Sequence, residues 1–361
     1  MRFHLLALPS AQTTKAYDLC GFTQVTIRFA RILKDLGHHV ILYASEENEA
    51  PCDELVTVIT KEETESLLAA TTNANTGLPD PTPYQYAYIE SWSPIWQLAN
   101  ARMIKEIEKR KQPRDFICSI SGGSQKPVAD RHPDLMFVEY SIGYQGSFSP
   151  YRVFESQAWR HHTHGAQQIT DIRYWDTVIP LFYDEAEFPF RSEKEPFALY
   201  VGRLIERKGL VIACRAAEAA GIPLKVIGHG NKLLVTNGAE YLGELKSAER
   251  NEWMSRAQCV LTPTIYVEPF NQVAVEAQFC GTPVITTDLG GFTETIEHGK
   301  TGFRCNYLGE FIRAIQNCKT LDPNQIRKRA VEKYSLSAVA PQYQAYFERL
   351  MVLWGDGWNT I

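Results

Sequence analysis

Short apolar runs alternate with stretches of helical periodicity over the first half of the chain. Residues 23–37 carry apolar positions at the spacing of an amphipathic helix, between one apolar run at 2–9 and another at 39–45. The runs that we interpret as strands of this half are 2–9, 39–45, 54–60, 116–121, 135–141 and 176–182. Because strands that alternate with helices form parallel sheets covered on both faces, this half predicts one α/β domain.

The same alternation starts again after the charged segment Glu-Lys-Glu-Pro at 193–196. The strands expected in this second series are 197–203, 224–230, 239–244, 259–265 and 283–288. Two such series predict two doubly wound, Rossmann-like α/β domains with a cleft between them. We place the boundary after residue 178, so that residues 1–178 form an N-terminal domain and residues 179–335 a C-terminal domain.

Composition and charge narrow the possible partners. The 361-residue chain has 37 Lys and Arg against 42 Asp and Glu, so it lacks the basic surplus with which proteins bind nucleic acid or anionic lipid. Its eight cysteines show no CxxC spacing and are typical of free thiols in a cytoplasmic protein. No apolar run reaches the roughly 20 residues of a membrane span. A strand rather than a signal peptide follows Met1, so we expect a cytoplasmic protein.

Two glutamates stand out in the segment 266–285. Glu268 lies just ahead of an expected helix, and Glu276 lies inside it, among apolar residues that surround it on nearly all sides. A helix of this composition is buried. Because an unpaired buried charge is unfavourable, the carboxylate of Glu276 needs a partner or a ligand.

Polar and flexible residues follow the strands of the second series, where parallel sheets bind their ligands. Arg203 and Lys208 are two cations around the turn after one strand, and Gly228 allows a close backbone approach after the next. The helix that begins near Asn271 offers free N–H groups to an anion. With two carboxylates to accept hydroxyl groups, this set suits a nucleoside-diphosphate sugar.

At these positions the sequence resembles the family 4 glycosyltransferases of the GT-B fold. The family's E-x7-E element matches Glu268 and Glu276, and its G-R-L-x-x-x-K-G stretch matches residues 202–209. The segments C-G-T-P-V-I, D-x-G-G and E-x-G-x-x-G-F match residues 280–285, 288–291 and 297–303. The resemblance is strong over residues 197–305 and weaker in the first half. Together these motifs are specific, although each alone is weak.

The resemblance implies a retaining transfer of a sugar from a UDP- or GDP-type donor to a hydroxyl acceptor. Arg203 and Lys208 would neutralise the leaving diphosphate, Glu268 would face the transferred sugar, and Glu276 would hold the ribose. The remaining donor-binding positions that it implies are Phe270, Asn271, Gln272, Val273, Gly21, Gly228 and Leu242. It also implies that residues 1–178 bind the acceptor, that residues 179–335 bind the donor, and that a helix in 336–361 crosses back to the first domain.

The sequence departs from the family pattern where the acceptor binds. The paired glycines of the family's first loop are Cys20 and Gly21 here. The family's histidine is absent from the ends of the strands 116–121 and 135–141, so Glu139, Tyr140 or Ser141 is the acceptor-site candidate. Asn271 replaces a family glycine. There is no D-x-D motif, so we expect neither a metal requirement nor a cofactor. We also expect the protein to be a monomer or a dimer.

Other interpretations remain open at this point. A nucleotide-sugar epimerase and a non-catalytic relative share the two-domain fold, and an enzyme that glycosylates DNA bases is possible within it. His161 and His164 share a helix face, which suits a metal, but the sequence favours a solvated or hinge-facing helix end. The aromatic residues of 84–96 suit either a packed core or a sugar-binding platform.

Overall fold

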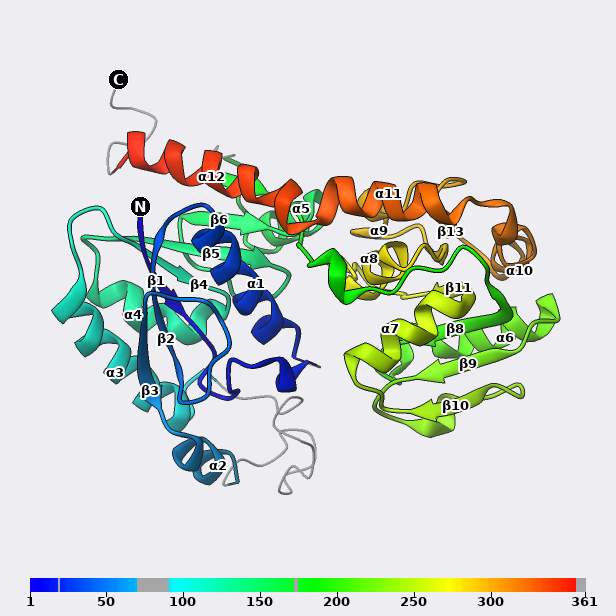
Figure 1. Ribbon diagram of the computed structural model, residues 1–361, viewed down its shortest axis with the longest axis horizontal. Helices are drawn as coiled ribbons and strands as arrows, with labels where there is room; N and C mark the ends of the chain where they lie inside the picture. Colours follow the sequence, from blue (N-terminus) through cyan, green and yellow to red (C-terminus); the bar gives the residue numbers. More distant parts are fainter. Residues whose placement is uncertain (19, 70–90, 172–174, 355–361) are drawn as a thin grey trace. The chain divides into compact units, whose positions relative to one another are not determined.

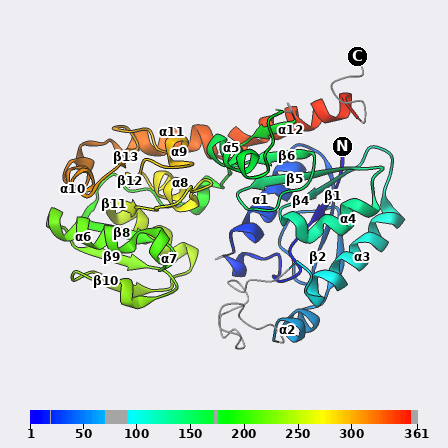
Figure 2. The ribbon, with the colours of Figure 1, turned by 180° about the vertical axis from the view of Figure 1, so that it is seen from behind.

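The computed structural model describes residues 1–18, 20–69, 91–171 and 175–354. The chain divides into two compact units (Figures 1 and 2). Unit 1 consists of Met1–Phe154, Asp171–Ile179 and Ala340–Ile361, and unit 2 of Glu155–Thr170 and Pro180–Val339. The chain passes from unit 1 to unit 2 after Ile179, one residue beyond the boundary expected from the sequence. Residues 155–170 group with unit 2, and the last segment of the chain groups with unit 1.

Unit 1 is built on a parallel sheet of seven strands in the order β3-β2-β1-β4-β5-β6-β7. Its strands are β1 (Arg2–Leu6), β2 (His39–Ser45), β3 (Glu54–Ile59), β4 (Phe116–Ser119), β5 (Met136–Ile142), β6 (Tyr151–Phe154) and β7 (Asp176–Val178). The sequence indicated all of these except β6. The helices of the unit are α1 (Gly21–Asp35), α2 (Lys61–Ala69), α3 (Pro94–Arg110), α4 (Lys126–Arg131) and most of α12 (Leu336–Val352).

Different side chains cover the two faces of this sheet. On one face, α3 and α4 bury Met103, Ile107 and Val128 against aliphatic strand residues. On the other face the core is aromatic: the rings of Phe29 in α1 and Phe347 in α12 contact strand aromatics. The doubly wound arrangement expected from the sequence is therefore present, with α12 as part of the covering layer.

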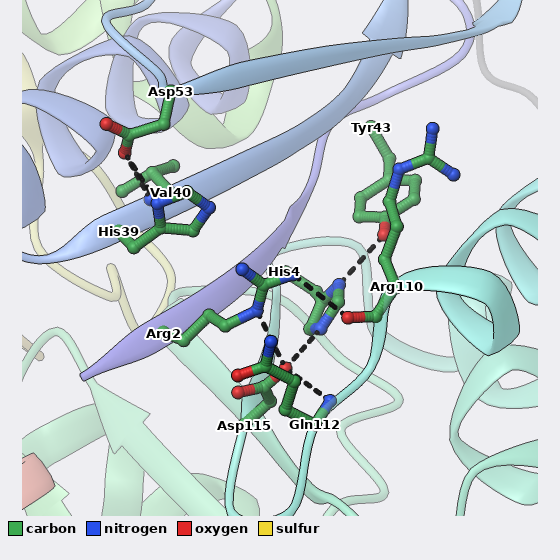
Figure 3. Close-up of polar contacts among 9 residues, drawn as sticks. All are labelled: Arg2, His4, His39, Val40, Tyr43, Asp53, Arg110, Gln112 and Asp115. Atoms are coloured by element: carbon green, nitrogen blue, oxygen red, sulfur yellow. Dashed lines mark hydrogen bonds and ion pairs between the residues drawn. The ribbon is translucent and has the colours of Figure 1, made fainter.

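A network of polar groups joins β1 and β2 to the segment that enters β4 (Figure 3). The ring of His4 lies between the hydroxyl of Tyr43, 2.8 Å from Nδ1, and Oδ2 of Asp115, 3.0 Å from Nε2. The same carboxylate accepts the N–H of Gln112 and the Nε–H of Arg2. Burial raises the pKa of Tyr43, so its hydroxyl keeps its proton. These groups satisfy one another's hydrogen-bonding capacity inside unit 1.

Unit 2 is built on a second parallel sheet, of six strands in the order β10-β9-β8-β11-β12-β13. Its strands are β8 (Glu195–Val201), β9 (Leu224–Ile227), β10 (Glu240–Gly243), β11 (Ala257–Thr262), β12 (Val284–Thr287) and β13 (Gly302–Cys305). The last of these was not indicated by the sequence. The helices are α5 (Gln157–Ala166), α6 (Leu210–Ala220), α7 (Ser247–Arg256), α8 (Gln272–Phe279), α9 (Phe292–Thr295), α10 (Leu308–Asn317) and α11 (Pro323–Tyr334).

Helices cover both faces of this second sheet too. On one face, α6 and α10 contribute Leu210, Ala213 and Phe311 to a core that includes residues of β8, β9 and β11. Elsewhere in the unit the ring of Phe279 in α8 stacks on Phe188. Within the described part of the chain, no helix is both long enough and apolar enough to cross a membrane.

Candidate functional site

The loops after β8 and β9 in unit 2 lie directly against each other. A β-carbon at Gly228, whose φ is 151°, would lie 1.8 Å from the carbonyl oxygen of Gly202, so only glycine fits there. Leu204 donates its N–H to the carbonyl of His229 across the same contact. Gly228 also donates its N–H to Gly243 and accepts the hydroxyl of Tyr241, which leaves its backbone groups engaged within the protein. Leu242 lies beside this contact in β10 and is partly buried.

The turn after β8 carries the two cations that the sequence singled out. The side chain of Arg203 is exposed, and it forms no hydrogen bond or ion pair with another described residue. Lys208 ends a short 3₁₀ turn (Glu206–Lys208), and its Nζ lies 2.7 Å from Oε2 of Glu268. Burial lowers the pKa of Lys208, the charge of Glu268 opposes that shift, and Arg203 and Arg207 add a smaller lowering effect. The structure therefore brings Lys208 and Glu268 together and leaves Arg203 available to an anion.

Glu268 lies in a closely packed loop between β11 and α8. Its carbonyl accepts the N–H of Gly291 at 2.7 Å, and a β-carbon at Gly290, whose φ is 57°, would lie 2.6 Å from its backbone nitrogen. The two glycines of the D-x-G-G segment thus allow the loop after β12 to pack on the backbone of Glu268. Glu268 as a whole residue is only 6% exposed. This packing gives the carboxylate a defined position.

Helix α8 begins directly after this loop, with Asn271 as its N-cap residue. Asn271 has a φ of 68°, in the left-handed region, and its side-chain oxygen accepts the N–H of Ala274 at 3.0 Å. Asparagine tolerates this conformation better than other residues with a side chain, which explains how it can replace the family glycine. Among the described residues, no hydrogen bond takes up the N–H groups of Gln272 and Val273. Phe270 is buried, so it can reach a ligand through its backbone alone.

Glu276 lies within α8, and the structure shows which partner compensates its burial. It is 5% exposed, and its Oε2 lies 3.2 Å from Nη2 of Arg250 in α7. The helix is buried from Ala274 to Phe279, as the apolar pattern predicted. The expectation that Glu276 has a partner or a ligand is therefore confirmed, and Arg250 is a residue that sequence reasoning missed because nothing in its own neighbourhood marks it.

A second carboxyl group near Glu268 was also missed. Glu155 directly precedes Ser156, whose hydroxyl donates to the carbonyl of Pro269, the residue after Glu268. Burial and the charge of Glu268 raise the pKa of Glu155 to about 8. No motif in the sequence contains Glu155, so only the fold could have revealed it.

The site residues expected in the first half lie in unit 1. Gly21 is the first residue of α1 and is partly buried. Glu139 is fully buried in β5, where it accepts the N–H groups of Phe148 and Ser149. The hydroxyl of Tyr140, which is also fully buried, lies 3.1 Å from that of Thr26. Glu139 and Tyr140 are therefore enclosed within the unit and expose no surface that an acceptor could contact, so we carry neither forward as an acceptor residue.

The structure also describes the histidines of 161–164 and part of the aromatic segment 84–96. Within the described residues, no group of three or more histidine, cysteine, aspartate or glutamate side chains is placed to hold a metal ion, and His164 is buried in α5. Of the aromatic residues of 84–96, Trp96 is 4% exposed and packs in a small core, whereas Trp92 is 70% exposed. Tyr84, Tyr86 and Tyr88 lie outside the described residues.

Comparison with known protein families and sequences supports the same region. Residues 183–315 match the model of the family "Glycosyl transferases group 1". The chain is 32% identical over 148 residues to a glycogen synthase of Mycobacterium tuberculosis, over 36% of each chain. It is 28% identical over 172 residues to a phosphatidyl-myo-inositol mannosyltransferase of Propionibacterium freudenreichii, over 44% of this chain and 45% of that protein. The chain thus matches less than half of the length of these relatives.

Solved structures resemble the whole chain. AviGT4, described as a glycosyltransferase involved in avilamycin A biosynthesis, has a TM-score of 0.69 at 19% identity, with 98% of each chain covered. Sucrose-phosphate synthase from Thermosynechococcus elongatus has a TM-score of 0.68 at 16% identity, over 98% of this chain and 99% of that one. At these identities the likeness concerns the fold. Residues 183–315 therefore match the glycosyl transferases group 1 family, and the chain has the GT-B fold of these solved structures.

Proposed function

We propose that this protein is a retaining glycosyltransferase that moves a sugar from a nucleoside-diphosphate sugar to a hydroxyl acceptor. The observation that carries the proposal is the arrangement at the carboxyl ends of β8 and β11, where an exposed cation, a paired cation and carboxylate, and a helix start lie on neighbouring strands. The cations and the helix start can bind a diphosphate, and the carboxylate can accept hydrogen bonds from sugar hydroxyls.

Each residue has a role in this proposal. Arg203 binds the diphosphate, and the free N–H groups at the start of α8 bind phosphate and sugar. Glu268 accepts a hydrogen bond from the transferred sugar, and Glu276 accepts one from the ribose. The carboxylate of Glu276 keeps a second oxygen for this purpose, because the contact from Arg250 is made to Oε2.

Lys208 changes partner when the donor binds. In the structure its ammonium is held by Glu268 and is mostly buried. A diphosphate carries more negative charge than one carboxylate, and the negative charge grows on the leaving phosphate as the glycosidic bond breaks. Lys208 then stabilises that developing charge at the transition state, while Glu268 is released to the sugar hydroxyls.

Support for the nature of the donor comes from relatives. An Anabaena protein named HepE was crystallised in complex with UDP, and it resembles this chain with a TM-score of 0.65 at 16% identity, over 97% of this chain. A UDP- or GDP-sugar donor, a hydroxyl acceptor and a cytoplasmic location are parts of the proposal. For the location, the supporting observation is that all eight cysteines are free.

The proposal is tested by incubating the protein with a panel of UDP-, GDP- and ADP-sugars. We expect one class of nucleotide to raise the melting temperature, and the matching nucleotide sugar to be hydrolysed slowly in the absence of an acceptor. Mass spectrometry of the nucleotide products separates transfer from epimerisation, because an epimerase returns an isomeric nucleotide sugar and no free nucleotide. Failure of every nucleotide in the panel to bind would refute the proposal.

A further inference from the structure

Glu155 is held next to the loop that carries Glu268. It is the last residue before Ser156, and the hydroxyl of Ser156 donates to the carbonyl of Pro269 at 2.5 Å. Pro269 directly follows Glu268 in the chain. This hydrogen bond therefore joins the residue next to Glu155 to the residue next to Glu268, and it holds the backbone of the two glutamates close together. All four residues belong to unit 2.

The backbone around Glu155 is rigidly fixed by the start of α5. Ser156 is the N-cap of this helix, and its side-chain oxygen accepts the N–H of Trp159 at 3.0 Å. The N–H groups of Gln157 and Ala158 both donate to the carboxylate of Glu294, at 2.9 Å each. The helix start thus receives both a cap and a negative charge, which stabilise it. Glu155 projects from a backbone that cannot shift without breaking these bonds.

The side chain of Glu155 has no hydrogen-bonding or ionic partner in the part of the chain that the structure describes. It is partly buried. The ammonium of Lys208 lies 2.7 Å from Oε2 of Glu268, and Arg203 and Arg207 are close enough to Lys208 to lower its pKa. A partly buried carboxyl group without a partner is unfavourable unless it is protonated or binds a ligand.

Electrostatic interactions favour the protonated form of this carboxyl. Burial and the negative charge of Glu268 raise the pKa of Glu155 to about 8. Burial and the charge of Glu268 also raise the pKa of Tyr266, so this phenol keeps its proton too. At neutral pH Glu155 therefore keeps its proton and can donate a hydrogen bond beside Glu268.

We propose that Glu155 and Glu268 together bind hydroxyl groups of the transferred sugar, and that Glu155 is a specificity-determining residue for the donor sugar. This inference rests on the proposed function and adds to it a residue outside the family motifs. A protonated carboxyl donates one hydrogen bond and accepts another, whereas a carboxylate only accepts. The pair therefore presents both a donor and acceptors, which suits a sugar with two neighbouring hydroxyl groups.

The test compares nucleoside diphosphates with the matching nucleotide sugars. Dissociation constants are measured by calorimetry at pH 7 for UDP, UDP-glucose, GDP and GDP-mannose, with the wild-type protein, Glu155→Leu and Glu155→Gln. We expect Glu155→Leu to bind the nucleoside diphosphate within about twofold of wild type. It should bind the nucleotide sugar about ten- to hundredfold more weakly, the range for a lost hydrogen bond to a charged or buried partner. Glu155→Gln, which keeps a donor and an acceptor, should stay within a few-fold of wild type.

The pH dependence separates a ligand contact from a structural effect. For the wild-type protein we compare the affinity for the nucleotide sugar with that for the nucleoside diphosphate. The ratio of these two affinities should fall by about tenfold between pH 7 and pH 9, because Glu155 loses its proton and then repels Glu268. Glu155→Gln cannot ionise, so its sugar-dependent affinity should stay constant over this range. A loss of the same size in the variant would contradict the inference.

Glu294→Gln serves as the matched control, because it weakens the support of α5 without changing a group at the sugar. An effect of Glu294→Gln as large as that of Glu155→Leu would assign the result to the position of α5 and overturn the inference. Equal sugar-dependent affinity in wild type and Glu155→Leu would also overturn it, while leaving the proposed function intact. If the wild-type protein bound neither these four compounds nor the ADP compounds of the panel, both the proposed function and this inference would fail.

Discussion

The ammonium group of Lys208 lies 2.7 Å from Oε2 of Glu268, and these two side chains are only 17% and 8% exposed. Each therefore compensates the charge of the other in a place that water reaches poorly. When one partner of such a pair is removed, the other remains as an uncompensated buried charge. Variants at this site must accordingly be assessed for stability as well as for activity.

Removal of either cation should lower the rate of transfer. We expect Arg203→Ala and Lys208→Ala each to reduce kcat/KM on the order of a hundredfold, a typical loss for an electrostatic stabiliser of the transition state. Arg203 is exposed, so its variant should melt at the wild-type temperature. Lys208→Ala should lose about 3 kcal/mol of unfolding free energy, because Glu268 is left unpaired. Turnover and chemical denaturation of both variants test this.

The double variant Lys208→Met with Glu268→Gln is the control for that prediction. It removes both charges together, so most of the lost stability should return while transfer stays impaired. If Lys208→Ala and Arg203→Ala turned over at the wild-type rate, the assignment of the diphosphate site would be wrong.

The two glutamates of the E-x7-E element should differ in their effect on binding. Glu276→Gln should weaken binding of the free nucleoside diphosphate, because Glu276 lies inside α8 and is proposed to hold the ribose. Glu268→Gln should spare that affinity and reduce kcat and kcat/KM together, as expected for a contact that strengthens in the transition state. Calorimetry with the nucleotide and steady-state kinetics measure the two effects. The opposite pattern would show that the two roles are exchanged.

Divalent metal should not be required for transfer. The two cations of the turn after β8 supply positive charge at the place where the diphosphate leaves. We therefore expect the initial rate to be unchanged after treatment with EDTA and gel filtration. A loss of activity that manganese or magnesium restores would contradict this expectation.

The stability of unit 1 should respond to the ionisation of Glu139. Burial raises the pKa of this carboxyl to about 7 from its usual value of 4.5, despite the N–H groups that it accepts. The protonated form is thus favoured by folding, so the contribution is fully present below pH 4.5 and is lost as the pH rises through about 7. The loss should amount to about 3 kcal/mol. The difference in unfolding free energy between wild type and Glu139→Gln, followed from pH 5 to pH 9, measures it; a constant difference would contradict the prediction.

The left-handed conformation of Asn271 leads to a test of the start of α8. Asn271→Gly should change the unfolding free energy by less than about 0.5 kcal/mol, because glycine adopts a φ of 68° readily. Asn271→Ala should lose about 2 kcal/mol, through the lost cap of Ala274 and the positive φ. Equal stability of the two variants in urea would show that the conformation of this residue does not limit the helix.

Much of the fold could be predicted from the sequence, because the signals are local. The alternation of apolar runs with helical spacing indicated eleven of the thirteen strands. Strands β6 and β13, of four residues each, were missed, since Tyr151–Phe154 and Gly302–Cys305 both include an arginine and are too short to show a period. The prediction that α8 is buried was also correct, because a helix with apolar residues on nearly all sides has no polar face to turn to water.

The sequence by itself thus determined the class of the fold, the loops that carry the candidate site, and the need of Glu276 for a partner. Only the tertiary structure decided which side chains meet. Lys208 and Glu268 are 60 residues apart, and Arg250 and Glu276 are 26 apart; Glu155 precedes Glu268 by more than either spacing. Hydrophobic periodicity acts over one or two turns of a helix or a few residues of a strand, so it carries no information on such pairs. They form because the strand order places β8 beside β11 and because α5 is fastened to the loop ahead of α8.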